Sequence, residues 1–263
     1  MALVDYHNHT YLCGHASGTP DDYIKTAIDA NLIEFGFSDH APLPVGLREG
    51  ITMKPQETEL YLNLIEQKKE IYKDEIVIKI GFEVDFPLHE SFDRRYLNDD
   101  RIDYIIGSCH FLGDWSFDHS DFIDEFDKRD IDEVYAEYYD NIKEIIQSGQ
   151  INIIGHFDLI KKFGHRAKKN FKSDLENLAE IISKRDIAVE INTAGLRKPV
   201  NEIYPSSEII EILFNKNVPI TFGSDSHLPE EVAYMFHKAE ELVKGIGYRK
   251  ISGFSKQRYN IVL

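Results

Sequence analysis

The sequence predicts an α/β fold in which seven strand–helix units form a distorted barrel. One observation is a repeated pattern, in which a short apolar run is followed by a small residue and then by a polar one. Another is that helical patterns lie between these runs, and strands that alternate with helices form mostly parallel sheets. The length of 263 residues also suits one closed α/β barrel. We therefore expect a single domain over residues 1–263.

The seven expected strands are rich in β-branched and aromatic residues, as strands generally are. They are predicted at residues 3–7, 35–40, 78–83, 105–110, 153–156, 189–192 and 220–225. In parallel barrels, functional side chains gather at the carboxyl ends of the strands. The polar residue of each repeat stands at that end, so the pattern directs seven segments of the chain toward one mouth.

Helices are expected between the strands. Residues 19–22, Thr-Pro-Asp-Asp, form a typical helix start, with proline in the first turn and acids after it. Further helices are predicted at residues 55–72, 131–147, 173–184, 205–216 and 229–243. The alternative architecture is an open doubly wound sheet, which usually has a glycine-rich phosphate loop after its first strand. Residues 7–10, His-Asn-His-Thr, stand there instead and favour the barrel.

The formal net charge of −16 argues against a nucleic-acid partner or an anionic membrane surface. An anionic small substrate remains compatible, because bound divalent cations would reverse the field locally. The chain has no run of about 18 apolar residues, and its first residues lack the features of a signal peptide. Its two cysteines argue against a disulfide framework. These features favour the cytoplasm and leave the oligomeric state open.

Nine residues at the predicted strand ends share metal-binding chemistry, since imidazole and carboxylate bind Zn²⁺ and also suit manganese and iron. These residues are His7, His9, His15, His40, Glu83, His110, His156, Asp225 and His227. His7 and His9 stand two apart on a strand and should face the same side, as should Asp225 and His227 if their strand extends that far. Glu83 has two oxygens and is suited to bridge two ions. A single histidine at a strand end is more often structural, but nine residues at matching positions indicate a metal site.

The remaining histidines and both cysteines are expected to have other roles. His89, His119, His165 and His237 fall outside the repeated pattern. Cys13 and Cys109 are metal ligands in principle, but we expect both to be small buried residues.

The motifs that carry these residues resemble the polymerase-and-histidinol-phosphatase (PHP) superfamily. The matching segments are His7–Thr10, Ser38–His40, the span around His110, and Gly223–His227. The resemblance covers essentially the whole chain, and all nine ligand positions are filled. It is greatest to the monofunctional histidinol-phosphatases, with further similarity in residues 107–112, 155–158 and 190–197. The resemblance implies a distorted (β/α)7 barrel of PHP type with its metal site at the carboxyl ends of the strands.

The resemblance also implies three divalent ions, with zinc, manganese and iron all suitable. One ion would be held by His7, His9, Glu83 and Asp225, a second by Glu83, His110 and His156, and a third by His15, His40 and His227. The implied activity is the hydrolysis of L-histidinol phosphate to L-histidinol and phosphate in histidine biosynthesis. A hydroxide that bridges two ions would attack the phosphorus.

Several further residues are predicted to act at this site. The catalytic candidates are Glu83, Asp225 and His227, although the acid that protonates the leaving group stays unassigned. Arg197 follows the sixth strand and is suited to bind phosphate with its planar fork. The family's second cationic contact falls near Lys161 and Lys162, of which we choose Lys162. Residues 115–118 follow the fourth strand, where Trp115, Phe117 and Asp118 form either an imidazole-binding wall or ordinary packing.

Three other functions remain open at this point. A phosphoesterase of the same type acting on another small ester, a nucleotide or an oligonucleotide would use the same metals. A nuclease would need a basic or aromatic groove, and no basic stripe is visible. An amidohydrolase commonly bridges its metals with a carbamylated lysine, where this chain offers Glu83. A non-catalytic zinc module is usually rich in cysteine ligands, which this set lacks.

Overall fold

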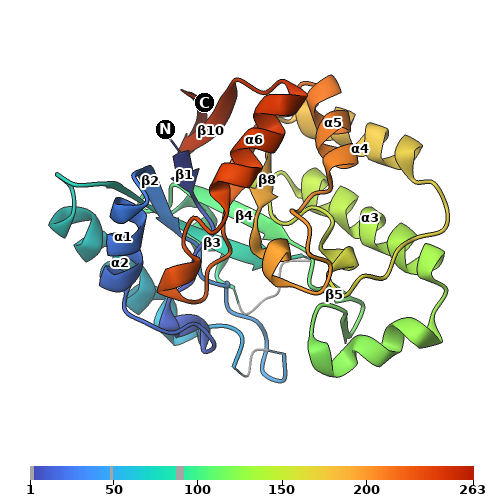
Figure 1. Ribbon diagram of the computed structural model, residues 1–263. Coiled ribbons are helices and arrows are strands. Elements are labelled where there is room, and N and C mark those ends of the chain that lie inside the picture. The colour runs from blue at the N-terminus through green and yellow to red at the C-terminus, as the bar shows by residue number, and fades with distance from the viewer. Residues whose placement is uncertain (1–2, 48–49, 87–91) are drawn as a thin grey trace.

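Seven parallel strands form a nearly closed barrel with helices on its outside (Figure 1). The structure is a computed structural model, and it describes residues 3–47, 50–86 and 92–263. Around the barrel the strands follow in chain order: β1 (Leu3–Asp5), β2 (Leu32–Phe37), β3 (Val77–Asp85), β4 (Tyr104–Ser108), β7 (Ile153–Ile154), β8 (Ala188–Asn192) and β9 (Ile220–Gly223). All seven strands predicted from the repeated pattern are present.

The barrel closes between its first and last strands. The backbone N–H of Tyr6 donates to the carbonyl oxygen of Phe222 at 3.1 Å, and Asn8 forms a parallel bridge with Ser226. An open doubly wound sheet reverses its strand order and leaves two edges unpaired. Here the strands follow in chain order and the first contacts the last, so that alternative is wrong. The closure brings the segments after β1 and β9 side by side at the carboxyl end of the barrel.

Six α-helices connect the strands. They are α1 (Pro20–Asp29), α2 (Thr58–Ile71), α3 (Ile131–Ser148), α4 (Lys172–Lys184), α5 (Ser207–Asn215) and α6 (Phe236–Ile246). The start of α1 follows the prediction, because Thr19 and Asp22 form a capping box and Pro20 occupies the first turn. The prediction for residues 229–243 is partly wrong. Ala233 and Met235 have positive φ angles of 54°, which interrupt the helix, so α6 begins only at Phe236.

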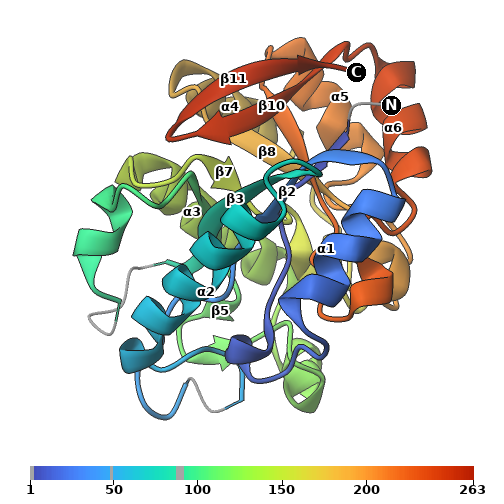
Figure 2. The same cartoon turned by 90° about the vertical axis from the view of Figure 1, so that its left-hand side faces the viewer.

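Two β-hairpins were not predicted. The short hairpin of β5 (Phe111–Leu112) and β6 (Trp115–Ser116) follows β4. The second hairpin, β10 (Lys250–Ser255) and β11 (Gln257–Val262), lies across one end of the barrel (Figure 2). It covers the amino ends of the strands, where the backbone N–H of Lys256 donates to the carbonyl oxygen of Asp103, the residue before β4, at 2.8 Å. This hairpin therefore leaves the other end of the barrel, formed by the carboxyl ends of the strands, uncovered.

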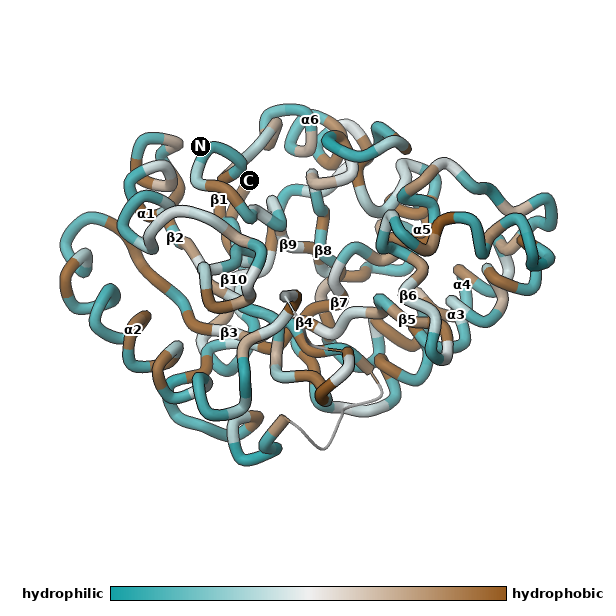
Figure 3. Tube along the Cα trace, turned by 90° about the horizontal axis from the view of Figure 1, so that it is seen from below, coloured by the Kyte–Doolittle hydropathy of each residue, from teal (hydrophilic) through white to brown (hydrophobic). Residues whose placement is uncertain are grey.

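The barrel interior is filled beneath the mouth. Tyr104 is buried and its hydroxyl donates to the carbonyl oxygen of Tyr6 at 2.6 Å. A Cβ atom on Gly36 or on Gly81 would overlap with the Tyr104 ring, so glycine is required at both positions. Viewed along the barrel, hydrophobic strands lie inside a ring of helices whose outer faces are hydrophilic (Figure 3). Among the described residues, no helix is long and apolar enough to cross a membrane.

Candidate metal centre

All nine predicted ligand residues lie at the mouth of the barrel, and eight of them are in segments that follow the carboxyl ends of the strands. Glu83 alone lies within a strand, on β3. The mouth gathers side chains that are up to 220 residues apart in sequence because all seven strands are parallel. Among the described residues, five overlapping groups of three residues each have potential ligand atoms that lie within 4.8 Å of one another inside the group, and together the groups include all nine residues.

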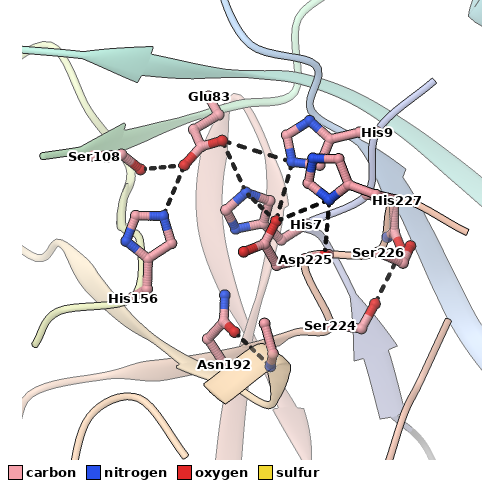
Figure 4. Close-up of polar contacts among 12 residues, drawn as sticks. His7, His9, Glu83, Ser108, His156, Asn192, Ser224, Asp225, Ser226 and His227 are labelled. Carbon is pink, nitrogen blue, oxygen red and sulfur yellow. Dashed lines mark hydrogen bonds and ion pairs between the residues drawn. The ribbon is translucent and has the colours of Figure 1, made fainter. Parts of the chain in front are cut away.

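Glu83 stands at the centre of this cluster and presents its two oxygens to different histidines (Figure 4). Its Oε1 lies 2.9 Å from Nε2 of His156 and 3.5 Å from Nε2 of His110. Its Oε2 lies 3.2 Å from Nε2 of His7 and 3.6 Å from Nε2 of His9. This arrangement is suited to a carboxylate that is shared between two cations.

Asp225 completes the side of the cluster that faces His7 and His9. Its Oδ1 lies 3.3 Å from Nε2 of His9 and 3.7 Å from Nε2 of His7. The strand does not extend as far as Asp225 and His227, because β9 ends at Gly223, so the condition for both to face one side of a strand is not met. Asp225 instead has a positive φ of 51°, and this turn directs its carboxylate back over the mouth.

The remaining three histidines form their own group. His15, His40 and His227 each place a ring nitrogen within 4.8 Å of the others. The rings of His15 and His227 are stacked with their centroids 4.4 Å apart. His40 also connects this group to the centre, since its Nδ1 lies 2.9 Å from Oε2 of Glu83.

The hydrogen bonding of the cluster fits cation binding. Nε2 of His7, Nε2 of His9, Nε2 of His227 and Oε2 of Glu83 are buried and have no hydrogen-bond partner among the described residues. Buried polar atoms normally find such a partner. Here they approach one another without hydrogen-bond geometry, which is the arrangement expected of ligands that point at a shared ion. The donors are imidazole nitrogens and carboxylate oxygens, which suit zinc, manganese and iron.

The groups of the cluster differ in protonation. Burial, helped by the neighbouring His40, lowers the pKa of His9 to about 3, and burial lowers the pKa of His227 well below its usual value. Burial alone would raise the pKa of Glu83, but the facing His7 and His40 bring it well below the ordinary value. Burial would lower the pKa of His7 and of His40, but neighbouring carboxylates raise both above the usual value. Because metal ions bind the neutral imidazole and the ionised carboxylate, these two histidines would release a proton when an ion binds.

A second layer of carboxylates and hydroxyls holds the candidate ligands, and the sequence prediction did not include it. Glu190 lies 2.7 Å from Nδ1 of His7, and Asp85 lies 2.8 Å from Nδ1 of His110. Ser108 donates to Oε1 of Glu83 at 2.6 Å. Such partners fix the orientation and tautomer of metal-binding histidines. A signal for Glu190 was available, since an acid in an otherwise apolar strand is rarely buried without a role.

A cavity of about 690 Å³ opens directly above the cluster, and both predicted phosphate contacts line it. Arg197 is held by its Nη2, which donates to the carbonyl oxygens of Ser224 and Asp225, and by Glu231, which lies 3.1 Å from its Nε. Its Nη1 is buried without a hydrogen-bond partner among the described residues. The guanidinium is therefore fixed in place and keeps one donor group available.

The two neighbouring lysines occupy different environments. Lys162 lines the cavity, and its Nζ lies 3.1 Å from Oδ2 of Asp118. Lys161 is fully buried and binds Asp158 at 2.8 Å and Glu202 at 3.0 Å. Of the two lysines, only Lys162 is positioned to contact a molecule in the cavity.

The histidines outside the repeated pattern lie apart from the cluster where the structure describes them. His165 stacks on Phe126 with a centroid distance of 4.2 Å, His237 is exposed on α6, and His119 lies at the exposed edge of the cavity. His89 falls outside the described residues.

Both cysteines are free and buried, as expected. The Sγ of Cys13 lies within 4.8 Å of ring nitrogens of His9 and His227. Burial raises the pKa of the Cys13 thiol to about 12, so it is protonated near neutral pH.

The aromatic residues after β4 pack inside the protein. Trp115 lies against Phe126 at a centroid distance of 4.7 Å, and Phe117 lies against Tyr138 at 5.6 Å. Both are buried, so they form packing and no wall of the cavity. Asp118 alone among the three residues lines the cavity.

Comparison with known proteins gives a consistent result. The PHP domain family matches residues 5–194. A "probable histidinol-phosphatase" of Deinococcus radiodurans is 36% identical over 95% of this chain and 96% of its own length. The histidinol-phosphatase of Bacillus subtilis is 28% identical, covering 90% of this chain and 97% of the relative.

Among solved structures, the histidinol phosphate phosphatase of Lactococcus lactis is similar in fold. It was crystallised with zinc, L-histidinol and phosphate. Its TM-score is 0.78 at 24% identity, and the match covers 96% of this chain and 97% of that one. The extent of the family match and the identity to the Deinococcus protein show that this chain belongs to the PHP domain family.

Proposed function

We propose that this protein is a metal-dependent phosphomonoesterase that hydrolyses L-histidinol phosphate to L-histidinol and phosphate, and so acts in histidine biosynthesis. The observation that carries the proposal is the placement of Glu83 between two sets of histidines, beneath a cavity lined by Arg197 and Lys162. The names of the relatives from Deinococcus radiodurans and Bacillus subtilis support the substrate. The zinc, L-histidinol and phosphate in the Lactococcus lactis structure support it further.

The nine residues would hold three divalent ions, with zinc, manganese or iron as the candidates. His7, His9, Glu83 and Asp225 would hold one ion, Glu83, His110 and His156 a second, and His15, His40 and His227 a third. The grouping is supported by the ring nitrogens of His15, His40 and His227, which already lie within 4.8 Å of one another. It is also supported by the division of the Glu83 oxygens between two sets of histidines.

When bound, the ions would neutralise the phosphate and supply a nucleophile by lowering the pKa of water. The chain's own residues then have to bind and orient the ester. The free Nη1 of Arg197 and the ammonium of Lys162 would bind phosphoryl oxygens and orient the phosphorus toward the cluster. Glu231 would support this role, because it ties Arg197 and also accepts a hydrogen bond from the backbone N–H of His227.

Catalytic roles fall to Glu83, Asp225 and His227. Glu83 would fix the spacing of the two sides of the centre. Departure of the alcohol requires a proton at the ester oxygen, and Asp225 and His227 are the candidates to hold it, since both line the cavity. Both would also be ligands, so the proton donor is left unassigned between them.

The proposal extends to the whole chain as one domain over residues 1–263 and to a cytoplasmic location. Two free, buried cysteines suit a reducing compartment. The expected partner is a small phosphorylated substrate, and the net charge of −16 disfavours nucleic acid.

A steady-state panel tests the activity. Metal-loaded protein should hydrolyse L-histidinol phosphate with a kcat/KM well above that for other phosphomonoesters and for short oligonucleotides. Activity should disappear when a chelator removes the metal and return when zinc or manganese is added. A preference for oligonucleotides, or activity that survives complete metal loss, would contradict the proposal.

A further inference from the structure

Asp118 lines the cavity beside the cationic residues and has no role in the metal centre or in the proposed phosphate contacts. The hairpin that precedes it is closed by a tight turn in which Gly113 has a positive φ of 58°. The next residue back from Asp118, Phe117, is fully buried against Tyr138. Asp118 therefore stands on a segment that is anchored by packing, which holds its carboxylate at a fixed point of the cavity wall.

Five carboxylates line the cavity within the described part of the chain: Glu83, Asp85, Asp118, Asp225 and Glu231. Glu83 and Asp225 face the histidine cluster. Asp85 is bound to His110, and Glu231 is bound to Arg197 and to the backbone of His227. Asp118 differs from these four in its partners among the described residues, which are the ammonium of Lys162 and the hydroxyl of Ser116, which donates to its Oδ1 at 3.4 Å.

The other oxygen of Asp118 lies 3.1 Å from Nζ of Lys162. An anion and a cation thus stand side by side on one wall of the cavity. Burial would raise the pKa of Asp118, but the charge of Lys162 overcomes this effect and the pKa is about 2. The carboxylate therefore keeps its negative charge at neutral pH.

The substrate of the proposed function has the complementary arrangement of charges. In L-histidinol phosphate the ammonium group is on the carbon next to the one that carries the phosphate ester. A protein group that binds this ammonium must therefore lie next to a group that binds the phosphate. The adjacent Asp118 and Lys162 meet that requirement, and among the five carboxylates Asp118 is the one whose described contacts include neither a candidate metal ligand nor Arg197.

We propose that Asp118 binds the ammonium group of the substrate and thereby selects phosphate esters that carry an amine beside the ester carbon. This inference rests on the proposed function for the identity of the ester and adds the residue that determines its specificity. Lys162 binds the phosphate of the same molecule, so the two members of one ion pair contact opposite charges of one substrate.

The test compares Asp118→Asn with wild type on L-histidinol phosphate and on its deamino analogue, which keeps the imidazole and the phosphate. The ratio of the two kcat/KM values should fall roughly 10- to 100-fold in the variant, the size of one hydrogen bond to a charged group. Activity on the deamino analogue should be retained. The ratio is measured on one sample, so it does not depend on the fraction of folded enzyme.

Two further variants serve as controls. Asp114→Asn changes an exposed acid in the turn of the same hairpin and should leave the ratio unchanged. Lys162→Met should lower kcat/KM for both esters by similar factors, because both carry the phosphate. If Asp118→Asn also lowers kcat/KM for both esters by equal factors, Asp118 only orients Lys162, and the proposal is overturned.

A second pair of esters separates this inference from the proposed function. Phosphoethanolamine and ethyl phosphate differ by the same amine but lack the imidazole. If wild type shows no preference for L-histidinol phosphate, the proposed function fails. A fall in the phosphoethanolamine to ethyl phosphate ratio in Asp118→Asn would still support an amine-binding carboxylate, whereas an unchanged ratio would overturn it.

Discussion

The carboxylate of Glu190 lies 2.7 Å from Nδ1 of His7, and both side chains are fully buried. This contact fixes the tautomer of the imidazole, so that Nε2 faces Glu83 and Asp225. Glu190 also accepts a hydrogen bond from the backbone N–H of His156 at 2.8 Å. One residue of β8 thus positions two segments of the candidate metal centre.

Replacing Glu190 by Gln should lower metal affinity roughly 10- to 100-fold, because the charge that orients a metal-binding histidine is lost while the side-chain shape is kept. Competition with a chelator of known affinity measures the effect. The matched control is Glu180→Gln, an exposed acid on α4 that pairs with Lys184. Equal metal affinity in wild type and Glu190→Gln would contradict the assigned role.

Replacing Arg197 by Lys should lower kcat/KM for the phosphate ester roughly 10- to 100-fold. A lysine has three donors on a single nitrogen, which is too few to contact the two backbone carbonyls, Glu231 and the phosphate together. Steady-state kinetics and inhibition by inorganic phosphate measure the loss.

Arg249→Lys is the matched control for this variant. Arg249 also donates to two backbone carbonyls, those of Lys244 and Tyr248, and does not line the cavity. A loss of less than twofold in Arg197→Lys would show that the guanidinium does not bind the phosphate.

Replacing Lys161 by Met should destabilise the protein by about 3 kcal/mol, because the buried carboxylate of Asp158 loses its cation. Urea unfolding at a fixed concentration of metal measures the change. Lys184→Met, in which an exposed surface pair is lost, should change stability by less than about 0.5 kcal/mol. A stable Lys161→Met protein with strongly reduced activity would instead indicate that Lys161 contacts the substrate.

The two lysines show where sequence reasoning reaches its limit. The position of a cation after the fifth barrel strand was predictable, but Lys161 ends a 3-10 helix and Lys162 caps it, and only tertiary packing decides which of the two side chains enters the cavity. Lys161 turns toward Glu202 and Asp158, and Lys162 turns into the cavity. The layer of carboxylates behind the histidines was missed for a related reason, since pairs such as Glu190 and His7 lie far apart in sequence and become neighbours only when the barrel closes.

The strands and the nine candidate ligands were easier to predict. Buried parallel strands are short apolar runs, and six of the seven predicted runs end in a histidine or a carboxylate. The two hairpins carried a weaker signal. Residues 250–262 form a hairpin that packs against the end of the barrel. The pattern of these residues alone does not distinguish such a hairpin from a peripheral loop. Helix α6 began later than predicted because residues before Phe236 adopt positive φ angles that the periodic pattern does not reveal.

Acid stability should depend in part on Asp99. Hydrogen bonds from Arg101 lower the pKa of Asp99 to about 2, whereas the unfolded chain has a value near 3.9. A carboxyl whose pKa is lower in the folded state stabilises the protein above its unfolded pKa, and this contribution is lost as the pH falls toward about 2. Asp99→Asn should therefore be less stable than wild type at neutral pH.

Thermal unfolding of wild type and Asp99→Asn as a function of pH measures this contribution. The difference in Tm should shrink between about pH 4 and pH 2. The metal centre is the same in both proteins, so its own acid sensitivity cancels in the difference. A difference in Tm that widens as the pH falls would contradict the conclusion that Arg101 lowers the pKa of Asp99.

The central claim is that Glu83 is shared between two cations. Anomalous X-ray diffraction from crystals grown with zinc or manganese tests it most directly. We predict one ion beside Oε1 of Glu83 with His110 and His156, a second beside Oε2 with His7, His9 and Asp225, and a third among His15, His40 and His227. Ions bound elsewhere, with none in contact with Glu83, would contradict this account.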